Sequence, residues 1–362
     1  MNTSDFDYEL PPERIAQWPL AERDASRMLL VERNTGRWRD TYFRELPNLL
    51  RGDELIVMNN VQVIPARLFG HRKGIHAQRV GRHNPARGEF LRTEIELLLV
   101  RRLSCDRWQA LVRPGRKVPT GEQITFGQGE LQATVEARLA FGLRLVRFEA
   151  SEGVDEALRR LGHVPLPPYI RREDEVIDRE RYQTVYATQG TAVAAPTAGL
   201  HFTPEILKHL RERGTDMVEV TLDVGLGTFE PVRTESLEQH KIHSESYEIS
   251  GQAAEAITRA LSQGRPVLAI GTSVVRALED AVPESGGRPV VAPGRRDATL
   301  FLYPGKPFRV VSQLLTNFHL PKSTLLALVA AFAGRKRVLA AYRHAVEADY
   351  RFYSYGDCML IR

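Results

Sequence analysis

The pattern of apolar and turn-forming residues changes twice along the chain, and these changes restrict the folds that the chain can adopt. Between Gln62 and Phe148, short alternating segments such as 94–100, 107–113 and 131–137 are separated by Gly, Pro and Asn, without a helical period. Short strands at this spacing are typical of a small β-barrel or sandwich. The flanking sequence has a different pattern, so we expect a β domain inserted into another domain.

The carboxyl-terminal part alternates between helical and extended segments. Predicted helices at 204–213 and 252–262 are followed by predicted strands at 217–224 and 266–270. Such alternation is typical of an α/β domain with a parallel sheet. We therefore expect helices to cover this sheet.

Together these patterns predict an α/β fold in which a discontinuous domain with a predominantly parallel sheet is interrupted by an inserted antiparallel β-barrel. The α/β catalytic domain would comprise residues 1–61 and 149–362, and the basic barrel domain residues 62–148. Ligands bind such sheets beyond the carboxyl ends of the strands. Loops 196–201, 225–229 and 271–273, which supply Gly and hydroxyl groups, are the expected binding loops.

One of these loops precedes a helix with clear starting signals. Thr203 is expected to cap the helix and Pro204 to be its first residue. The helix dipole and free N–H groups would favour an anion near Thr197 and His201. These residues fit a tight turn with a core histidine equally well, so both interpretations stay open here.

The positive charge of the chain is concentrated in the predicted barrel. Residues 62–148 contain 16 Lys and Arg against 7 Asp and Glu, whereas the whole chain has a net charge of only +5. Such a local excess is expected of a surface that contacts phosphates, and favours a nucleic-acid partner. The alternative is a solvated arginine-rich loop at 71–92.

Several classes of protein are disfavoured by what the sequence lacks. It has no nucleotide-binding glycine motif, and its two cysteines, Cys105 and Cys358, lie far apart without a partner motif. The apolar run 325–333 is too short to span a bilayer. We expect a cytoplasmic protein with reduced thiols and no metal.

Three polar clusters are candidates for chemistry. His243, Ser244 and Glu245 place a base, a hydroxyl and a carboxylate together, although sequence alone cannot establish a hydrolase triad. The second cluster, 316–324, precedes a helix that Ser323 or Thr324 would cap, and this structural account leaves Asn317 and His319 unexplained. The third, 349–357, is rich in aromatics and could hold a planar base or simply plug the core.

Taken together, these segments resemble the S-adenosylmethionine:tRNA ribosyltransferase-isomerase family of queuosine biosynthesis over nearly the whole chain. The segments that carry the resemblance are 6–11, 59–68, 182–187, 193–202, 243–245, 315–325 and 353–357. The resemblance implies an α/β domain interrupted by a β-barrel. It also implies transfer of the ribosyl part of S-adenosylmethionine to the aminomethyl group of a 7-deazaguanine in tRNA, with rearrangement to an epoxycyclopentane and loss of adenine and methionine.

The sulfonium of S-adenosylmethionine acidifies the neighbouring C5′ protons, so the reaction needs a residue that accepts one of them. His201 or His243 would transfer this proton, and Glu245 would orient a histidine or balance the sulfonium charge. The residues expected to bind substrate are Thr197, Gly199, Thr228, Thr272, Arg276, Asn317, His319, Tyr353 and Asp357. S-adenosylmethionine would be consumed as a substrate, so no cofactor is expected. The chain is expected to act as a monomer.

Three features depart from the family pattern. Asp223 stands where the family commonly has His, Val274 stands where a hydroxyl is usual, and residues 72–92 are longer and more basic. We give Asp223 no catalytic role. The alternative functions are a non-catalytic RNA-binding protein and a base-exchanging tRNA transglycosylase, neither of which would depend on S-adenosylmethionine.

Overall fold

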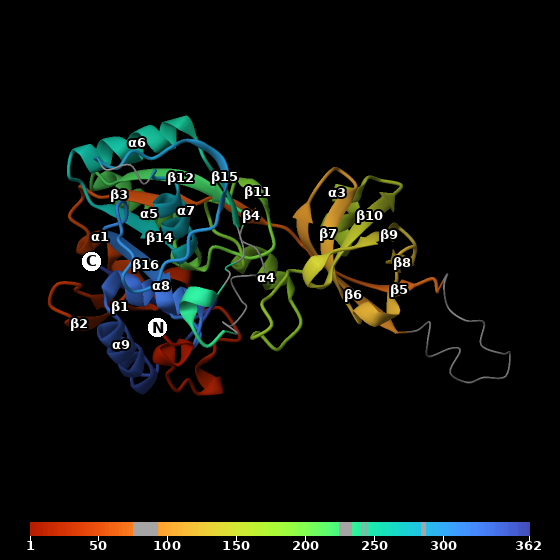
Figure 1. Ribbon diagram of the computed structural model, residues 1–362, viewed down its shortest axis with the longest axis horizontal. Helices are drawn as coiled ribbons and strands as arrows, with labels where there is room; N and C mark the ends of the chain where they lie inside the picture. Colours follow the sequence, from red (N-terminus) through yellow and green to blue (C-terminus); the bar gives the residue numbers. More distant parts are fainter. Residues whose placement is uncertain (75–92, 224–233, 241, 243–244, 284–286) are drawn as a thin grey trace. The chain divides into compact units, whose positions relative to one another are not determined.

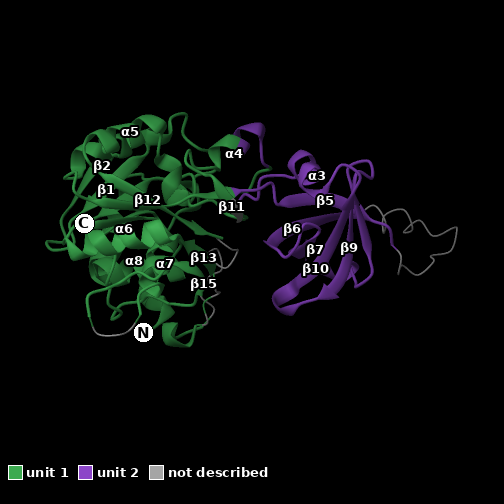
Figure 2. Cartoon of the chain, turned by 90° about the horizontal axis from the view of Figure 1, so that it is seen from above, with its two compact units in different colours: residues 1–62, 167–173, 180–362 green, residues 63–166, 174–179 purple. Residues whose placement is uncertain are grey.

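The computed structural model describes residues 1–74, 93–223, 234–240, 242, 245–283 and 287–362. The chain divides into two compact units (Figure 2). Unit 1 comprises Met1–Gln62, Pro167–Glu173 and Glu180–Arg362, and unit 2 comprises Val63–Leu166 and Asp174–Arg179. Each unit is described separately below.

Unit 1 is built on a mixed sheet, which Figure 1 shows with its covering helices. Among the described residues its strands are, in spatial order, β15 (Gly294–Ala298), β13 (Glu245–Ile249), β12 (Asp216–Leu222), β3 (Leu55–Asn59), β14 (Val267–Ile270), β16 (Gln313–Asn317), β17 (Cys358–Ile361), β1 (Arg27–Val31) and β2 (Trp38–Tyr42). The central strands β12, β3, β14 and β16 run parallel, with Leu55 opposite Val267. Antiparallel pairs lie toward both edges, including the hairpin of β1 and β2.

The central strand β3 is buried on both faces of the sheet, which explains why it is apolar from Leu55 to Met58. Alternate strand residues point to opposite faces, so Leu55 and Val57 belong to one core and Ile56 and Met58 to the other. The helices that contribute to the first core are α6 (Gly251–Ser262), α7 (Thr272–Asp280), α8 (Thr324–Ala333) and α9 (Arg335–Glu347). The short helix α1 (Leu46–Leu49) and helix α5 (Pro204–Glu212) contribute to the second core.

Helix starts follow the local signals in the sequence. The Thr203 hydroxyl accepts a hydrogen bond from the backbone N–H of Ile206 at 3.2 Å, and Ser323 accepts one from Leu326 at 3.1 Å. Both predicted caps are therefore confirmed. Among the described residues, no helix combines the length and apolar character required to cross a membrane.

Unit 2 contains a closed antiparallel barrel. Its strands are β5 (Arg67–Arg72), β6 (Glu94–Arg102), β7 (Arg107–Arg113), β8 (Gln123–Phe126), β9 (Leu131–Arg138) and β10 (Leu143–Ala150). Buried and less buried side chains alternate along these strands, as expected when one face of each strand fills the interior. The predicted fold class, an α/β domain interrupted by a β-barrel, is confirmed.

Unit 2 continues beyond residue 148. Helix α3 (Val154–Leu161), which ends before Gly162, follows the last barrel strand. The chain then returns to the barrel, where His163 and Arg67 exchange backbone hydrogen bonds of 2.8 and 3.2 Å. These bonds attach the segment after α3 to the first barrel strand.

Candidate active site

A pocket in unit 1 lies at the carboxyl ends of the parallel strands β14 and β16. Its empty volume is about 720 Å³, a figure that includes space open to solvent. Three segments meet there: the 3-10 helix η7 (Thr197–His201), the start of α7 and the segment after β16. Its lining residues are Tyr169, Ala195, Pro196, Thr197, Ala198, Gly271, Thr272, Ser273, Thr316, Asn317, Phe318, His319, Leu320, Ser323, Leu325, Tyr353 and Ser354.

The pocket lining combines apolar side chains with hydroxyl and amide groups, and the described residues that form it include no Asp, Glu, Lys or Arg. Thr272 and Ser273 belong to the first turn of α7, where backbone N–H groups and the positive end of the helix dipole favour a carboxylate or another acceptor. Gly271 before this helix has φ 98°, a conformation that glycine adopts readily. The described part of the site therefore offers hydroxyl and N–H donors.

Asn317 connects this pocket to His201. The Asn317 amide donates from Nδ2 to the carbonyl of Tyr353 at 2.9 Å, which directs Oδ1 toward Nε2 of His201 at 3.3 Å. Nδ1 of His201 lies 2.8 Å from the hydroxyl of Ser26, and this hydroxyl donates to the carbonyl of Arg23 at 3.2 Å. Burial lowers the pKa of His201 to about 4, so the ring is neutral at neutral pH. His201 is not among the residues that line the pocket and contacts it through Asn317.

His319 lines the pocket and is held at three points. Its backbone N–H donates to the hydroxyl of Tyr342 at 3.1 Å, and its carbonyl accepts a hydrogen bond from the hydroxyl of Tyr8 at 2.5 Å. Its Nε2 lies 2.8 Å from the hydroxyl of Thr316, which itself donates to the carbonyl of Asn317. Nε2 is therefore the protonated nitrogen and Nδ1 the acceptor. Burial lowers the pKa of His319 to about 3.

Aromatic rings form another part of the wall. Tyr169 and Tyr353 stack with ring centroids 4.4 Å apart and an interplanar angle of 19°. The Tyr169 hydroxyl lies 2.7 Å from that of Ser354, which holds the pair in place. A planar apolar surface of this kind suits a nucleobase.

Other residues proposed from the sequence lie outside the pocket lining. The carboxylate of Glu245 forms a buried ion pair with Arg276, with 2.5 Å between Oε2 and Nη1. Asp357 accepts hydrogen bonds of 2.8 Å from the backbone N–H groups of Arg27 and Arg351, so it organises the chain locally. Burial raises the pKa of Asp357.

Gly199 is enclosed by the protein itself. Its N–H donates to the carbonyl of Pro196 at 2.8 Å, within η7. A Cβ atom on this residue would lie 2.1 Å from the hydroxyl of the buried Tyr186 and 2.8 Å from Cγ2 of Thr184. Close packing therefore explains the glycine.

The remaining positions that the sequence singled out lie away from the pocket lining or outside the described residues. Thr228, His243 and loop 225–229 lie outside the described residues. Asp223 forms an ion pair with Arg295 at 3.4 Å, and Val274 is fully buried in the core of unit 1. Neither position contributes to the pocket lining.

Sequence reasoning brought Thr197, Thr272, Asn317, His319 and Tyr353 forward, and the structure places all five around one pocket. It missed Tyr169, and it put forward Ser273, Thr316 and Ser354 only as members of wider segments. The hydroxyl and amide side chains of Thr316 and Asn317, at the end of β16, were the available signal for Thr316. Tyr169 gave no local signal, because its partner Tyr353 lies far away in the sequence.

A pocket at the carboxyl edge of parallel strands, lined by convergent polar groups and aromatic rings, places the chain among α/β enzymes that bind a small substrate at this edge. The sequence comparison then gives the family. The model of the queuosine biosynthesis protein family matches residues 3–361, and the chain belongs to this family.

Individual relatives agree with this result over their full length. A protein of Solibacter usitatus called S-adenosylmethionine:tRNA ribosyltransferase-isomerase is 55% identical over 363 residues, with 100% of each chain covered. A protein of the same name from Pelotomaculum thermopropionicum is 48% identical over 361 residues, also with 100% of each covered. The crystal structure of an S-adenosylmethionine tRNA ribosyltransferase from Thermotoga maritima is 34% identical, with 99% of this chain and 100% of that chain covered and a TM-score of 0.53. The family resemblance expected from the sequence is confirmed.

Proposed function

We propose that this chain is an S-adenosylmethionine:tRNA ribosyltransferase-isomerase. It transfers the ribosyl moiety of S-adenosylmethionine to the aminomethyl group of 7-aminomethyl-7-deazaguanine in tRNA and isomerises it, giving epoxyqueuosine-tRNA, adenine and methionine. The observation that carries the proposal is the full-length identity of 55% to a relative with this name. Because its macromolecular substrate is tRNA, we also propose that the protein acts in the cytoplasm. The expectation that it acts as a monomer stays a proposal from the sequence.

The pocket suits a substrate that brings its own reactivity. The sulfonium of S-adenosylmethionine acidifies the adjacent C5′ protons and later leaves as a thioether, so S-adenosylmethionine is consumed and no separate cofactor is needed for this step. The protein has to align two substrates and exclude water. Hydroxyl groups of Thr197 and Thr272 would bind the ribose or the methionine carboxylate, and the Tyr169–Tyr353 pair would stack on adenine.

The histidines take different roles in this proposal. His319 would accept a hydrogen bond from the substrate through Nδ1, because Nε2 is engaged with Thr316. His201 would hold the Asn317 carboxamide in the orientation that the pocket requires. The sequence put forward His201 and His243 for transfer of the C5′ proton, and both ring nitrogens of His201 are already engaged, with Ser26 and Asn317. His243 would therefore transfer this proton, with Glu245 supporting the site through its ion pair with Arg276.

The direct test is incubation of the protein with S-adenosylmethionine and tRNA that carries 7-aminomethyl-7-deazaguanine. Release of adenine and methionine in equal amounts, one per modified nucleotide, is the expected result. Binding of the tRNA without release of adenine would instead favour a non-catalytic RNA-binding protein. Base exchange without S-adenosylmethionine would favour a transglycosylase.

Two substitutions test the proposed acceptor at His319. Glutamine places an amide where Nε2 lies and keeps the contact with Thr316, whereas asparagine places an amide oxygen where Nδ1 lies. Loss of one buried hydrogen bond costs about 1–3 kcal/mol. We therefore expect His319→Gln to lower kcat/KM for S-adenosylmethionine by roughly 10- to 100-fold, and His319→Asn to retain more activity. Steady-state rates of adenine release would show this order, and equal losses in both variants would contradict the role of Nδ1.

A further inference from the structure

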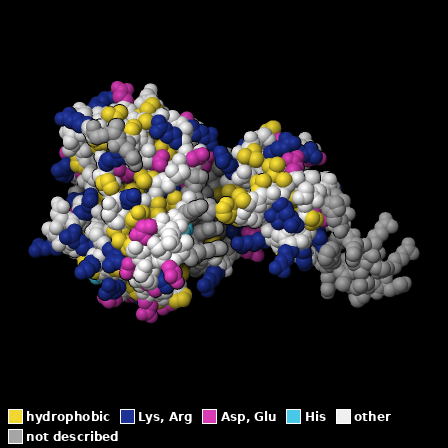
Figure 3. Space-filling model, in the orientation of Figure 1, with side chains coloured by type: hydrophobic (Ala, Val, Ile, Leu, Met, Phe, Trp, Pro, Cys, Tyr) yellow, Lys and Arg dark blue, Asp and Glu magenta, His cyan; other side chains and the backbone are white. Residues whose placement is uncertain are grey.

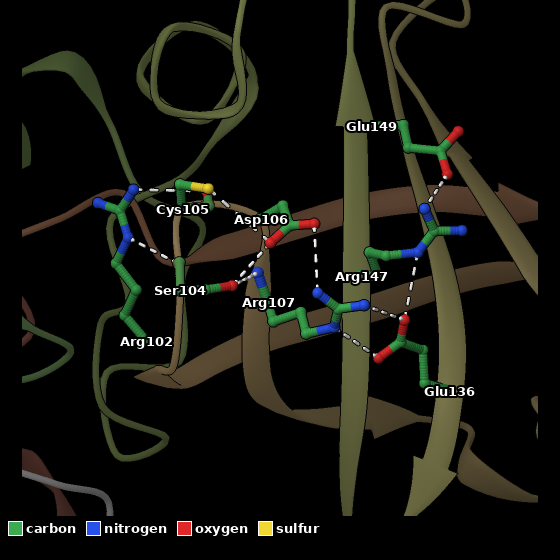
Figure 4. A network of polar contacts seen from close by, with 8 residues as sticks. All are labelled: Arg102, Ser104, Cys105, Asp106, Arg107, Glu136, Arg147 and Glu149. Atoms are coloured by element: carbon green, nitrogen blue, oxygen red, sulfur yellow. Dashed lines mark hydrogen bonds and ion pairs between the residues drawn. The ribbon is translucent and has the colours of Figure 1, made fainter.

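The barrel of unit 2 carries two sets of arginines with different surroundings. In the first set, shown in Figure 4, Arg107 and Arg147 both contact the carboxylate of Glu136, at 3.0 and 3.2 Å. Arg147 also contacts Glu149 at 2.8 Å. The charge of these arginines is balanced within the barrel itself, which leaves them poorly suited to hold an external anion.

The second set lines a groove of about 930 Å³ that is open to solvent. Its members are Arg113, Arg116, Arg138 and Arg144, and the remaining lining residues are Leu111, Val112, Gly115 and Gly142. No carboxylate lines the groove among the described residues. The nearest one in strand register, Glu96 opposite Arg113, is already bound to Arg67 at 3.2 Å. Figure 3 shows that Lys and Arg side chains are prominent on the visible surface of this unit.

Two of these arginines occupy an unfavourable position. Arg138 and Arg144 lie directly opposite each other on the antiparallel strands β9 and β10. Like charges at opposed positions destabilise a sheet. Arg144 cannot turn away easily, because it is buried and donates to the carbonyls of Gly142 and Leu143, at 3.0 Å each. Burial, followed by the charge of Arg138, lowers the pKa of Arg144. An anion in the groove would relieve this repulsion.

The turn between the same two strands presents an aromatic ring. Phe141 has φ 56° in the 3-10 helix η6 (Ala140–Gly142), and 85% of it is exposed. Its neighbours along the chain, Arg138 and Gly142, line the groove. Cationic grooves with an adjacent aromatic ring are characteristic of surfaces that follow a nucleic-acid backbone and stack on a base.

We propose that this arginine groove, defined by Arg113, Arg116, Arg138 and Arg144, binds consecutive phosphates of the tRNA. The proposal rests on the proposed function for the identity of the RNA. A single small anion could contact only some of the four guanidinium groups, whereas a sugar-phosphate backbone supplies a series of charges along the groove. The groove contacts the backbone and therefore contributes affinity rather than sequence selection.

The test compares two double variants that remove the same charge from the same barrel. Arg113→Gln with Arg138→Gln alters exposed arginines of the groove, and Arg107→Gln with Arg147→Gln alters the arginines that are paired with carboxylates. Filter binding of tRNA at several salt concentrations should show a Kd raised at least about tenfold for the groove variant. The slope of log Kd against log salt should fall by about two, or one for each phosphate contact. The control variant should change Kd less than about twofold.

The outcomes separate this proposal from the proposed reaction. Equal Kd values for the groove variant and the wild-type protein, or equal losses in both double variants, would overturn the groove as the tRNA site. Adenine release by the wild-type protein would still support the reaction in that case. Conversely, weaker tRNA binding by the groove variant alone would support the groove even if the wild-type protein released no adenine.

Discussion

Replacement of Glu245 by alanine is expected to lower the free energy of unfolding by about 3–5 kcal/mol, because it leaves the Arg276 guanidinium buried without its carboxylate. The two side chains are only 4% and 3% exposed, and 2.5 Å separates Oε2 from Nη1. Arg276 also donates to the carbonyls of Ala298 and Leu300, which fixes its position in unit 1. Urea denaturation followed by circular dichroism would measure the loss.

A matched variant separates this structural role from a catalytic one. Replacing both partners, Glu245→Leu with Arg276→Met, removes the buried charges together and should recover most of the lost stability. If Glu245→Ala instead abolished adenine release while its unfolding transition stayed unchanged, the carboxylate would act on the reaction as the sequence suggested. The pair of measurements thus decides between the two roles.

Stability is also expected to fall steeply in mild acid because of two buried histidines. The pKa of His201 is lowered to about 4 and that of His319 to about 3, from 6.5 in an unfolded chain. Between pH 6.5 and the folded-state pKa of each histidine, the unfolded chain binds a proton that the folded protein does not bind. The histidines therefore contribute their full stability above pH 6.5, and this stability is lost as the pH decreases. Each histidine contributes a slope of up to about 1.4 kcal/mol per pH unit, or about 3 kcal/mol for His201 by pH 4.

The contribution of His201 can be isolated with His201→Gln. This variant loses native hydrogen bonds and should be less stable at pH 7, but its unfolding free energy should depend less on pH between 6.5 and 4. Denaturation curves at half-unit pH intervals would compare the two slopes. A variant with the wild-type slope would mean that His201 is protonated in the folded protein.

Local patterns in the sequence were sufficient to predict many elements of the fold. The caps Thr203 and Ser323 and the alternating segments that form the barrel strands each depend on residues that are close in the sequence. The order of strands in the sheet was less accessible, because pairing depends on contacts across hundreds of residues. The antiparallel pair of β16 and β17 is an example.

The candidate site divides in the same way. Loop residues such as Thr197 and Thr272 could be proposed because the carboxyl ends of parallel strands converge. The hydrogen bond between His201 and Asn317 joins residues that are 116 positions apart, and the stacking of Tyr169 on Tyr353 spans a still longer interval. No periodicity or motif encodes such contacts, so they could only be found in three dimensions.

The location of β17 has a consequence for how the protein is made on the ribosome. Strand β17 is inserted between β1 and β16, with Met28 opposite Cys358, so β1 has no partner on that side until residues 358–361 have been synthesised. The barrel strands, in contrast, all lie between residues 67 and 150 and can pair much earlier during translation. Unit 2 can therefore fold while the growing chain still lacks the strand that joins the two parts of the unit 1 sheet.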